Sequence, residues 1–331
     1  MKNFLSKIHW QLDQKYNNQF EMLSHNVASY RTRVGLTLNK KFKYLISAGF
    51  DFNHKAEFIL IPKITQNYDS VLAYIKKYKD QNKNITLDYT DNHYQVDTKN
   101  YFYKRVFEEN IIDQLVVNSN HMKNLASRFF QGRIYVIPDP IEIVPQQLKE
   151  SQNNNILWFG HMSNFEYLIN KFSKWPDVKI DTFKLITNFT PDMIPHFKNV
   201  MSGYLNKIFN RFELHAWSFK ILIDESKNVN KIIIPGNRDD IRKSGVSSNR
   251  LITAFALGKM VAATKYDSYL PYINYFTDID NNSEFINFLT SNFKEDILNK
   301  AINIVVPNYS IQLISNLWQE FIEELLFKKK I

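Results

Sequence analysis

The sequence predicts an α/β protein with two domains, each built around a parallel sheet. Short apolar runs of strand length alternate with amphipathic segments of helical period through most of the 331 residues. This alternation occurs twice. Between the two runs, Pro138, Pro140 and Pro145 precede a stretch rich in Gln, Lys, Ser and Asn, which is typical of a linker. The length also suits roughly two domains of ordinary size.

The first run contains β-branched or aromatic segments that end at Pro, Asn or Asp. The expected strands cover residues 4–10, 44–48, 56–61, 84–88, 114–117 and 134–137, and the expected helices cover 68–78, 101–112 and 121–129. The segment that begins at residue 31 is also compatible with a helix. Because a helix separates most successive strands, the strands should pair in parallel.

The second run begins at Ile156 and continues the same alternation. The expected strands cover 156–159, 184–187, 212–217, 231–235 and 261–263, and the expected helices cover 163–175, 219–226, 251–257, 284–293 and 295–306, with a loop and helix in 191–209. We therefore predict two Rossmann-like domains facing a cleft that holds the ligand. Residues 1–140 form the first domain, 141–155 the linker and 156–309 the second domain, and a C-terminal helix over 310–331 packs back toward the first.

Composition narrows the function classes without choosing one. The formal net charge of +9 and the pI near 9.3 favour an anionic partner, which includes nucleic acid, anionic lipid and phosphorylated small molecules. The absence of cysteine excludes disulfides and thiolate chemistry, and no HExxH spacing occurs, so we expect no metal site. No apolar leader follows Met1 and no apolar run approaches 18 residues, which favours a cytoplasmic protein.

A basic loop between a strand and a helix is the first candidate site. The strand 231–235 ends at Pro235 and Gly236, and a helix of apolar period begins near Leu251. The loop and the helix start carry cations and N-cap residue types: Arg238, Arg242, Lys243, Ser247, Ser248, Asn249 and Arg250. A helix N-terminus flanked by cations favours a phosphate. The alternative is an ordinary solvated loop, and the glycine spacing of a P-loop is absent.

Two more groups of titratable residues stand out in the first run. Asp88, Asp91 and His93 follow the strand 84–88, and α/β sheets bind ligands at the carboxyl ends of their strands. A turn built from Asp and Asn is the structural alternative. Arg31 and Arg33 precede a helix-compatible segment and either hold a phosphate or are surface charges.

Five stretches in order make the chain resemble the GT-B glycosyltransferases, in particular those of bacterial surface-polysaccharide assembly. SYRTR resembles an early arginine motif, LDYTDNH an acidic strand end, and VVNSNHMKNL with IYVIPDPIE the end of the N-terminal domain. ILWFGHMSN resembles the glycine loop of the nucleotide-binding domain, and IIIP with KSGVSSNRLITAFALGKMVAA resembles the donor-phosphate loop and helix. The resemblance covers most of residues 28–275.

The resemblance implies a metal-independent transfer of a sugar from a nucleotide-sugar donor to a cell-surface glycan or lipid-linked acceptor. The implied donor-binding residues are Gly160, His161, Lys243, Ser247, Ser248, Asn249 and Arg250. Asp91 is the expected general base if the enzyme inverts, and His93 is expected to orient it or to contact the donor sugar. Arg31 and Arg33 are expected to meet an acidic or phosphorylated acceptor. No cofactor is expected beyond the donor itself.

Three positions depart from the family pattern. Thr253 stands where many retaining members carry a glutamate, Met260 replaces the usual proline, and Gly245 falls about where an earlier glutamate would lie. The sequence therefore does not predict whether the configuration is retained or inverted. His161 follows a single glycine, so it is either a phosphate contact or a neutral loop residue.

Other functions fit the same fold. A sugar-nucleotide epimerase or hydrolase would need no acceptor, and a non-catalytic partner subunit would need no catalytic residues. Nucleic-acid binding is not expected, because the cations are spread along the chain without a recognition motif. The basic, aromatic C-terminus either lies on the anionic inner face of a membrane or is simply solvated.

Overall fold

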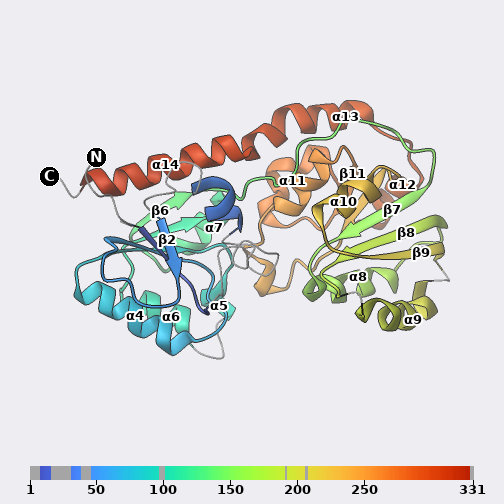
Figure 1. The fold of residues 1–331 in the computed structure, drawn as a ribbon. Helices are drawn as coiled ribbons and strands as arrows, with labels where there is room; N and C mark the ends of the chain where they lie inside the picture. The colour runs from blue at the N-terminus through green and yellow to red at the C-terminus, as the bar shows by residue number, and fades with distance from the viewer. Residues whose placement is uncertain are drawn as a thin grey trace. The chain divides into compact units, whose positions relative to one another are not determined.

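The computed structural model describes residues 8–15, 31–38, 46–96, 101–190, 192–205 and 208–328. The chain forms two compact units, and neither unit is one continuous segment (Figure 1). Unit 1 consists of Met1–Glu142, Asp240–Ser247 and Tyr309–Ile331. Unit 2 consists of Ile143–Asp239 and Ser248–Asn308.

The described residues of unit 1 form a six-stranded sheet in the order β2-β1-β3-β4-β5-β6. Every pair is parallel, as the helical connections predicted. The strands are β1 (Ile8–Gln11), β2 (Ile46–Gly49), β3 (Phe58–Ile61), β4 (Asn84–Asp88), β5 (Gln114–Val117) and β6 (Arg133–Val136). The expected first two strands, 4–10 and 44–48, overlap β1 and β2, and their residues 4–7 and 44–45 fall outside the described residues.

Successive side chains of β3 point to opposite faces of this sheet, and each face has its own core. Phe58 and Leu60 pack with a core formed by the C-terminal helix, whereas Ile59 and Ile61 pack with the opposite one. Figure 1 shows this arrangement, with α14 on one side of the sheet and α4 and α6 on the other. Because both faces are covered, β3 is apolar on both sides.

The helices of unit 1 come from all three of its segments. They are η2 (Arg31–Leu38), α4 (Tyr68–Asp80), α5 (His93–Val96), α6 (Phe102–Glu108), α7 (Asn120–Ala126), the short η4 (Ile241–Lys243) and α14 (Ile311–Lys328). The long C-terminal helix predicted over 310–331 is present as α14, which covers Ile311–Lys328 of the described residues. Its Trp318 is fully buried against the sheet, and Glu324 forms an ion pair of 2.6 Å with Arg133 of β6.

Unit 2 contains a second six-stranded parallel sheet, in the order β12-β11-β10-β7-β8-β9. Its strands are β7 (Asn155–Phe159), β8 (Ile180–Thr187), β9 (Phe209–Ala216), β10 (Lys231–Ile234), β11 (Met260–Ala263) and β12 (Thr277–Asp278). The predicted α/β class with two parallel sheets is confirmed. The sequence did not indicate β12, which pairs with β11 over only two residues.

Helices cover this sheet as well. They are η3 (Met162–Asn164), α8 (Phe165–Phe172), α9 (Met193–Leu205), α10 (Phe219–Ser226), α11 (Asn249–Ala256), η5 (Asp267–Tyr275), α12 (Asn282–Thr290), α13 (Glu295–Lys300), η6 (Ala301–Val305) and η7 (Val306–Tyr309). One large core joins the sheet to α8 and α12. Within the described residues, no helix is both long enough and apolar enough to cross a membrane.

Two differences from the predicted elements have clear physical causes. The helix expected over 101–112 ends at Glu108, because Asn110 takes a left-handed conformation with φ 51° and stops it. The strands β8 and β9 each have eight residues rather than four and six, because they continue pairing through Thr182 and Arg211, which are polar and gave no strand signal.

His9 is a buried residue of β1 and pairs with Ser47 of the neighbouring strand β2. Its Nδ1 is 3.0 Å from Ser47 Oγ, and Asn53 Nδ2 donates to the same hydroxyl at 2.9 Å. Burial lowers the pKa of His9 from 6.5 to about 4, opposed by a hydrogen bond with the backbone of Gly49. The imidazole is therefore neutral in the folded protein at neutral pH.

This burial makes His9 a source of acid sensitivity. Because its pKa is lower in the folded state, the unfolded chain binds a proton first as the pH falls below 6.5. We expect the free energy of unfolding of the wild type, relative to His9→Gln, to fall by about 2 kcal/mol between pH 7 and pH 5. Urea denaturation of both proteins at the two pH values measures this. An identical pH dependence in the two proteins would contradict it.

Candidate functional site

Three strands of unit 1 end beside a group of polar residues. Lys63 follows β3, Asp91 follows β4, and Asn118 follows β5. Lys63 Nζ lies 2.7 Å from Asp91 Oδ2, and His93 Nε2 lies 3.6 Å from the same oxygen. The structure therefore brings together Asp91 and His93, as predicted, and adds Lys63.

The charges around Asp91 keep it ionised. Burial alone would raise the pKa of this carboxyl group, but Lys63, His93 and Lys243 together hold it below its ordinary value. Asp91 is therefore a carboxylate at neutral pH and has the capacity to accept a proton. His93 is the first residue of α5 rather than a loop residue, and its ring stacks on Tyr103 with centroids 4.5 Å apart.

The basic loop Asp240–Ser247 packs within unit 1, although the sequence placed it in the second domain. Asn92 Nδ2 donates to Ser244 Oγ at 2.7 Å, and Ser247 Oγ donates to Asp139 Oδ2 at 2.7 Å. The Ser247 hydroxyl group, predicted to bind donor phosphate, therefore anchors the loop in this structure.

Gly245 explains one departure from the family pattern. A Cβ atom at this position would lie 2.2 Å from Met122 Sδ and 3.0 Å from Asn92 N. Its carbonyl oxygen also accepts a bond of 3.4 Å from Asn118 Nδ2. The loop thus approaches the ends of β4 and β5 too closely for a glutamate.

Arg33 does not lie where the sequence predicted. It is fully buried, and its guanidinium is 3.3 Å from Asp88 Oδ1 and 3.3 Å from Asp139 Oδ1. It also donates to the carbonyl oxygen of Ile137 and lies 5.7 Å from the ring of Trp318. An acceptor does not reach a guanidinium in this position, so the acceptor-binding prediction for Arg33 is corrected to a structural role.

The partners of Arg33 are affected by the same burial. Burial raises the pKa of Asp88 to about 6, with Arg33 opposing this rise and Asp139 adding to it. Asp88 was considered with Asp91 as a site residue, but its side chain points into the interior of unit 1. Arg31 is the first residue of η2, and the position of its side chain lies outside the described part of the chain.

In unit 2, Arg250 lies beneath the glycine that follows β7. Its Nη2 donates to Phe159 O at 2.6 Å, and its guanidinium lies 5.3 Å from the ring centroid of Trp158. A Cβ atom at Gly160 would be 3.0 Å from the Arg250 guanidinium carbon, so glycine provides the space for it. The N–H of Gly160 already donates to Ile186 O, so its predicted phosphate contact is not made through that group.

Arg250 is a half-buried cation whose Nε atom is closed off from solvent. Burial lowers its pKa, and the hydroxyl groups of Tyr269 and Tyr266 oppose this effect. Its Nε is shielded from solvent without a hydrogen-bond partner, and no carboxylate among the described residues forms an ion pair with it. A shielded guanidinium without a carboxylate is suited to bind an anion.

Three other residues of unit 2 that were predicted to bind the donor are His161, Ser248 and Asn249. His161 caps η3 by accepting from Ser163 N, and its other ring nitrogen lies 3.2 Å from the Asn188 amide. Ser248 occupies the N-cap position of α11 but does not cap it through its side chain. Asn249 Oδ1 accepts a bond of 3.0 Å from Thr253 Oγ1.

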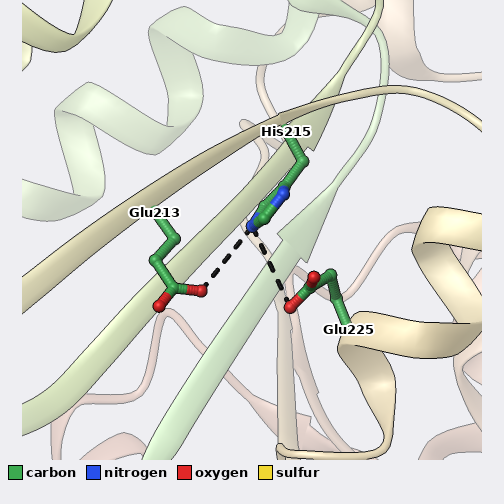
Figure 2. A group of neighbouring side chains, drawn as sticks. All are labelled: Glu213, His215 and Glu225. Carbon is green, nitrogen blue, oxygen red and sulfur yellow. Dashed lines mark ion pairs between the residues drawn. The ribbon is translucent and has the colours of Figure 1, made fainter.

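A second group of titratable residues lies on β9 and α10 of unit 2, away from the predicted residues. Figure 2 shows that Glu213, His215 and Glu225 point toward one another, and their ligand atoms lie within 4.8 Å of one another. Lys184 Nζ lies 2.5 Å from Glu225 Oε2 and 3.4 Å from Glu213 Oε2. An ammonium group therefore already occupies the position between the two carboxylates.

Solved structures provide the comparison that sequence searches do not. No family model and no curated protein matches this chain. HepE from Anabaena, in complex with UDP and glucose, aligns with a TM-score of 0.65 at 12% identity over 96% of this chain and 100% of its own. A glycosyltransferase from Rickettsia africae aligns with a TM-score of 0.56 at 14% identity over 95% and 84% of the two chains.

An α-glucosyltransferase in complex with UDP-glucose and DNA also aligns, with a TM-score of 0.57 at 10% identity over 96% of this chain and 98% of its own. At these identities the likeness concerns the fold. The two parallel sheets and their helices have the GT-B fold, and the structures that share it are glycosyltransferases.

The sequence missed Lys63, although a signal for it was present. It follows Pro62 directly after a predicted strand, so it lies beyond the carboxyl end of β3 as Asp91 lies beyond that of β4. The burial of Arg33 had no local signal, because its carboxylate partners are 55 and 106 positions away, the differences between 88 or 139 and 33.

The Lys184 cluster gives a prediction about metal binding. Lys184→Met removes the internal cation, so the free energy of unfolding should fall by roughly 3 kcal/mol. The two carboxylates and His215 are then available to Zn²⁺, which should raise the melting temperature of the variant more than that of the wild type. Thermal unfolding with and without ZnCl₂ measures both effects.

Lys227→Met is the control, because Lys227 forms an exposed pair of 2.6 Å with Asp224. It should change stability little. An equal loss of stability in both variants would contradict the internal role of Lys184. No effect of zinc on Lys184→Met would contradict the predicted binding of Zn²⁺ by the two carboxylates and His215.

Proposed function

We propose that this chain is a glycosyltransferase that moves a sugar from a nucleotide-activated donor to a hydroxyl group of a cell-surface glycan or lipid-linked acceptor. The observation that carries the proposal is Arg250, a shielded guanidinium that no described carboxylate neutralises. The glycosyltransferases that share the fold support the class of reaction, and the UDP in their complexes makes UDP-sugars the first donors to test.

The donor diphosphate is assigned to Arg250 and to the start of α11. The first N–H groups of a helix have no carbonyl partner within it, and the dipole is positive at that end. Ser248 and Asn249 lie at this start, and the chain reaches them directly from Lys243 and Ser247. Charge that develops on the departing diphosphate is stabilised by these cations and N–H groups, so the proposal requires no metal ion.

The acceptor chemistry is assigned to unit 1. When the acceptor oxygen bonds to the sugar carbon, the bond from that carbon to the diphosphate breaks and its electron pair leaves with the diphosphate. The acceptor's proton passes to Asp91, which its cationic neighbours keep ionised. Asp91 has this role if the transfer inverts the configuration at the sugar carbon. His93 contacts the same carboxylate oxygen as Lys63 and orients the group.

The choice of acceptor leads to two further expectations. A lipid-linked acceptor would bring the enzyme to an anionic membrane surface, where the net charge of +9 favours peripheral contact. Nucleic acid is not the proposed acceptor, because the DNA in one similar structure belongs to a different protein at 10% identity.

The donor assignment predicts the effect of changing Arg250. Arg250→Ala should weaken nucleoside diphosphate binding about 30- to 100-fold, through the loss of charge-assisted bonds worth about 2 to 3 kcal/mol. Arg250→Lys keeps the charge and most of the packing, and should lose less. Calorimetric titration with UDP, GDP, CDP and dTDP, in the presence of EDTA, measures the affinities and identifies the base.

Arg242→Ala is the matched control, since Arg242 lies in the loop that precedes α11 but is exposed and paired with Asp240 at 2.6 Å. Its affinity should be close to wild type. Equal affinities for wild type and Arg250→Ala would remove the donor site. Binding only without EDTA would mean that a metal is required.

The acceptor assignment predicts a loss of turnover without a loss of donor binding. Asp91→Asn should lower kcat at least about a hundredfold, because the amide does not accept the proton. Its nucleotide affinity should stay unchanged. Release of nucleoside diphosphate from UDP-sugars, with and without a panel of glycan acceptors, measures turnover.

Consumption of the donor without any acceptor would favour a hydrolase or an epimerase of the same fold. Nucleotide binding without any consumption would favour a partner subunit. A fully active Asp91→Asn variant would mean that another group accepts the proton.

A further inference from the structure

Lys63 is part of the Asp91 group but has no role in the transfer described above. It follows β3, and its ammonium lies 2.7 Å from Asp91 Oδ2. The side chains of Lys63 and Asp91 are 42% and 34% exposed, so the carboxylate is half-buried and still accessible to a substrate. His93 Nε2 approaches the same oxygen, at 3.6 Å.

Both neighbours therefore gather on one of the two carboxylate oxygens. Within the described part of the chain, Asp91 Oδ1 makes no hydrogen bond and no ion pair. A carboxylate held through one oxygen presents the other in a fixed direction. Oδ1 is thus the atom available to an incoming hydroxyl group.

The backbone next to Lys63 is held by the side chain of Tyr103, whose ring also stacks on His93. Tyr103 is buried, and its hydroxyl group accepts from Ile64 N at 2.9 Å and lies 3.3 Å from Ile64 O. The His93 ring stacks on Tyr103 at an interplanar angle of 16°. The residue next to Lys63 and the imidazole beside Asp91 are therefore both held by one buried side chain.

An ordinary surface ion pair would not have this construction. Such pairs join mobile side chains and contribute little to stability. Here the backbone beside Lys63 is bonded to a buried tyrosine, and the carboxylate has a second neighbour in His93. The arrangement orients Asp91 more than it stabilises the fold.

We propose that Lys63 is a positioning residue, which fixes Oδ2 of Asp91 and so leaves Oδ1 to accept the proton of the acceptor hydroxyl group. This inference rests on the proposed function. The ammonium also acts through charge. Of the groups that face Asp91, Lys63, His93 and Lys243 lower its pKa against the effect of burial, and the buried Tyr103 also lies in its field.

These charges predict in which direction the pKa of Asp91 changes when the Lys63 ammonium group is removed. Without Lys63 the pKa of Asp91 rises, so the carboxylate takes up a proton at a higher pH and the acidic limb of the profile of kcat/KM moves to higher pH. Lys63→Met should also lower kcat at pH 6 by about tenfold or more. Lys63→Arg should restore both, because it returns the cation. The nucleotide dissociation constant should not change.

Unit 1 contains a matched control. Lys79 and Asp113 form an ion pair of 2.6 Å with side chains 38% and 32% exposed, close to the values for Lys63 and Asp91. Lys79 belongs to α4 and Asp113 directly precedes β5, so neither residue follows a strand. Lys79→Met should leave the pH profile unchanged.

The experiment measures pH profiles of donor turnover for the wild type, the two Lys63 variants and Lys79→Met. It also follows the Asp91 carboxyl carbon by NMR in each protein without substrate. An acidic limb and a carboxyl titration that move only in Lys63→Met support the role. If the wild type turns over the donor while Lys63→Met keeps its acidic limb, the role of Lys63 is overturned. A wild type that binds no nucleotide overturns the proposed function instead.

Discussion

All strands of a parallel sheet run in one direction, so their carboxyl ends lie together at one end of the sheet. Each strand must therefore be joined to the next by a crossover that returns along a face of the sheet. In unit 1 this constraint brings Lys63, Asp91 and Asn118 together at the carboxyl ends of β3, β4 and β5, although they are distant in sequence. In unit 2 it places Gly160 at the corresponding end of β7, where Arg250 packs beneath it. The crossovers cover both faces, so polar groups able to meet a ligand gather where the strands end.

The guanidinium groups of Arg33 and Arg250 carry the same charge but have different neighbours. Arg33 is surrounded by Asp88, Asp139 and backbone carbonyl groups, so its charge is balanced inside unit 1. Arg250 has a carbonyl partner and aromatic neighbours but no carboxylate among the described residues. Burying a charge is costly unless it is paired, so the first arginine stabilises its surroundings and the second is left with affinity for an external anion.

The sequence predicted the fold better than the site. Apolar runs and helical periods are local signals, and they were sufficient for the α/β class, the two parallel sheets and α14. The proximity of Asp91 and His93 could be predicted because both follow one strand end, and their catalytic roles stay predictions. The burial of Arg33 and the anchoring of Ser247 by Asp139 depend on contacts between distant segments, which periodicity does not reveal. The short β12 was missed because two residues carry no periodic signal.

Each unit consists of more than one segment of the chain, which limits how recombination can exchange the units during evolution. Asp240–Ser247 belongs to unit 1, but it is inserted between β10 and α11, and the end of the chain returns to unit 1 as α14. A recombination event that joins the first 142 residues to a foreign partner would remove the loop that packs on Asn92 and the helix that buries Trp10. New combinations of the two halves therefore have to arise by gradual substitution or by exchange of several segments at once, rather than by a single crossover in the linker.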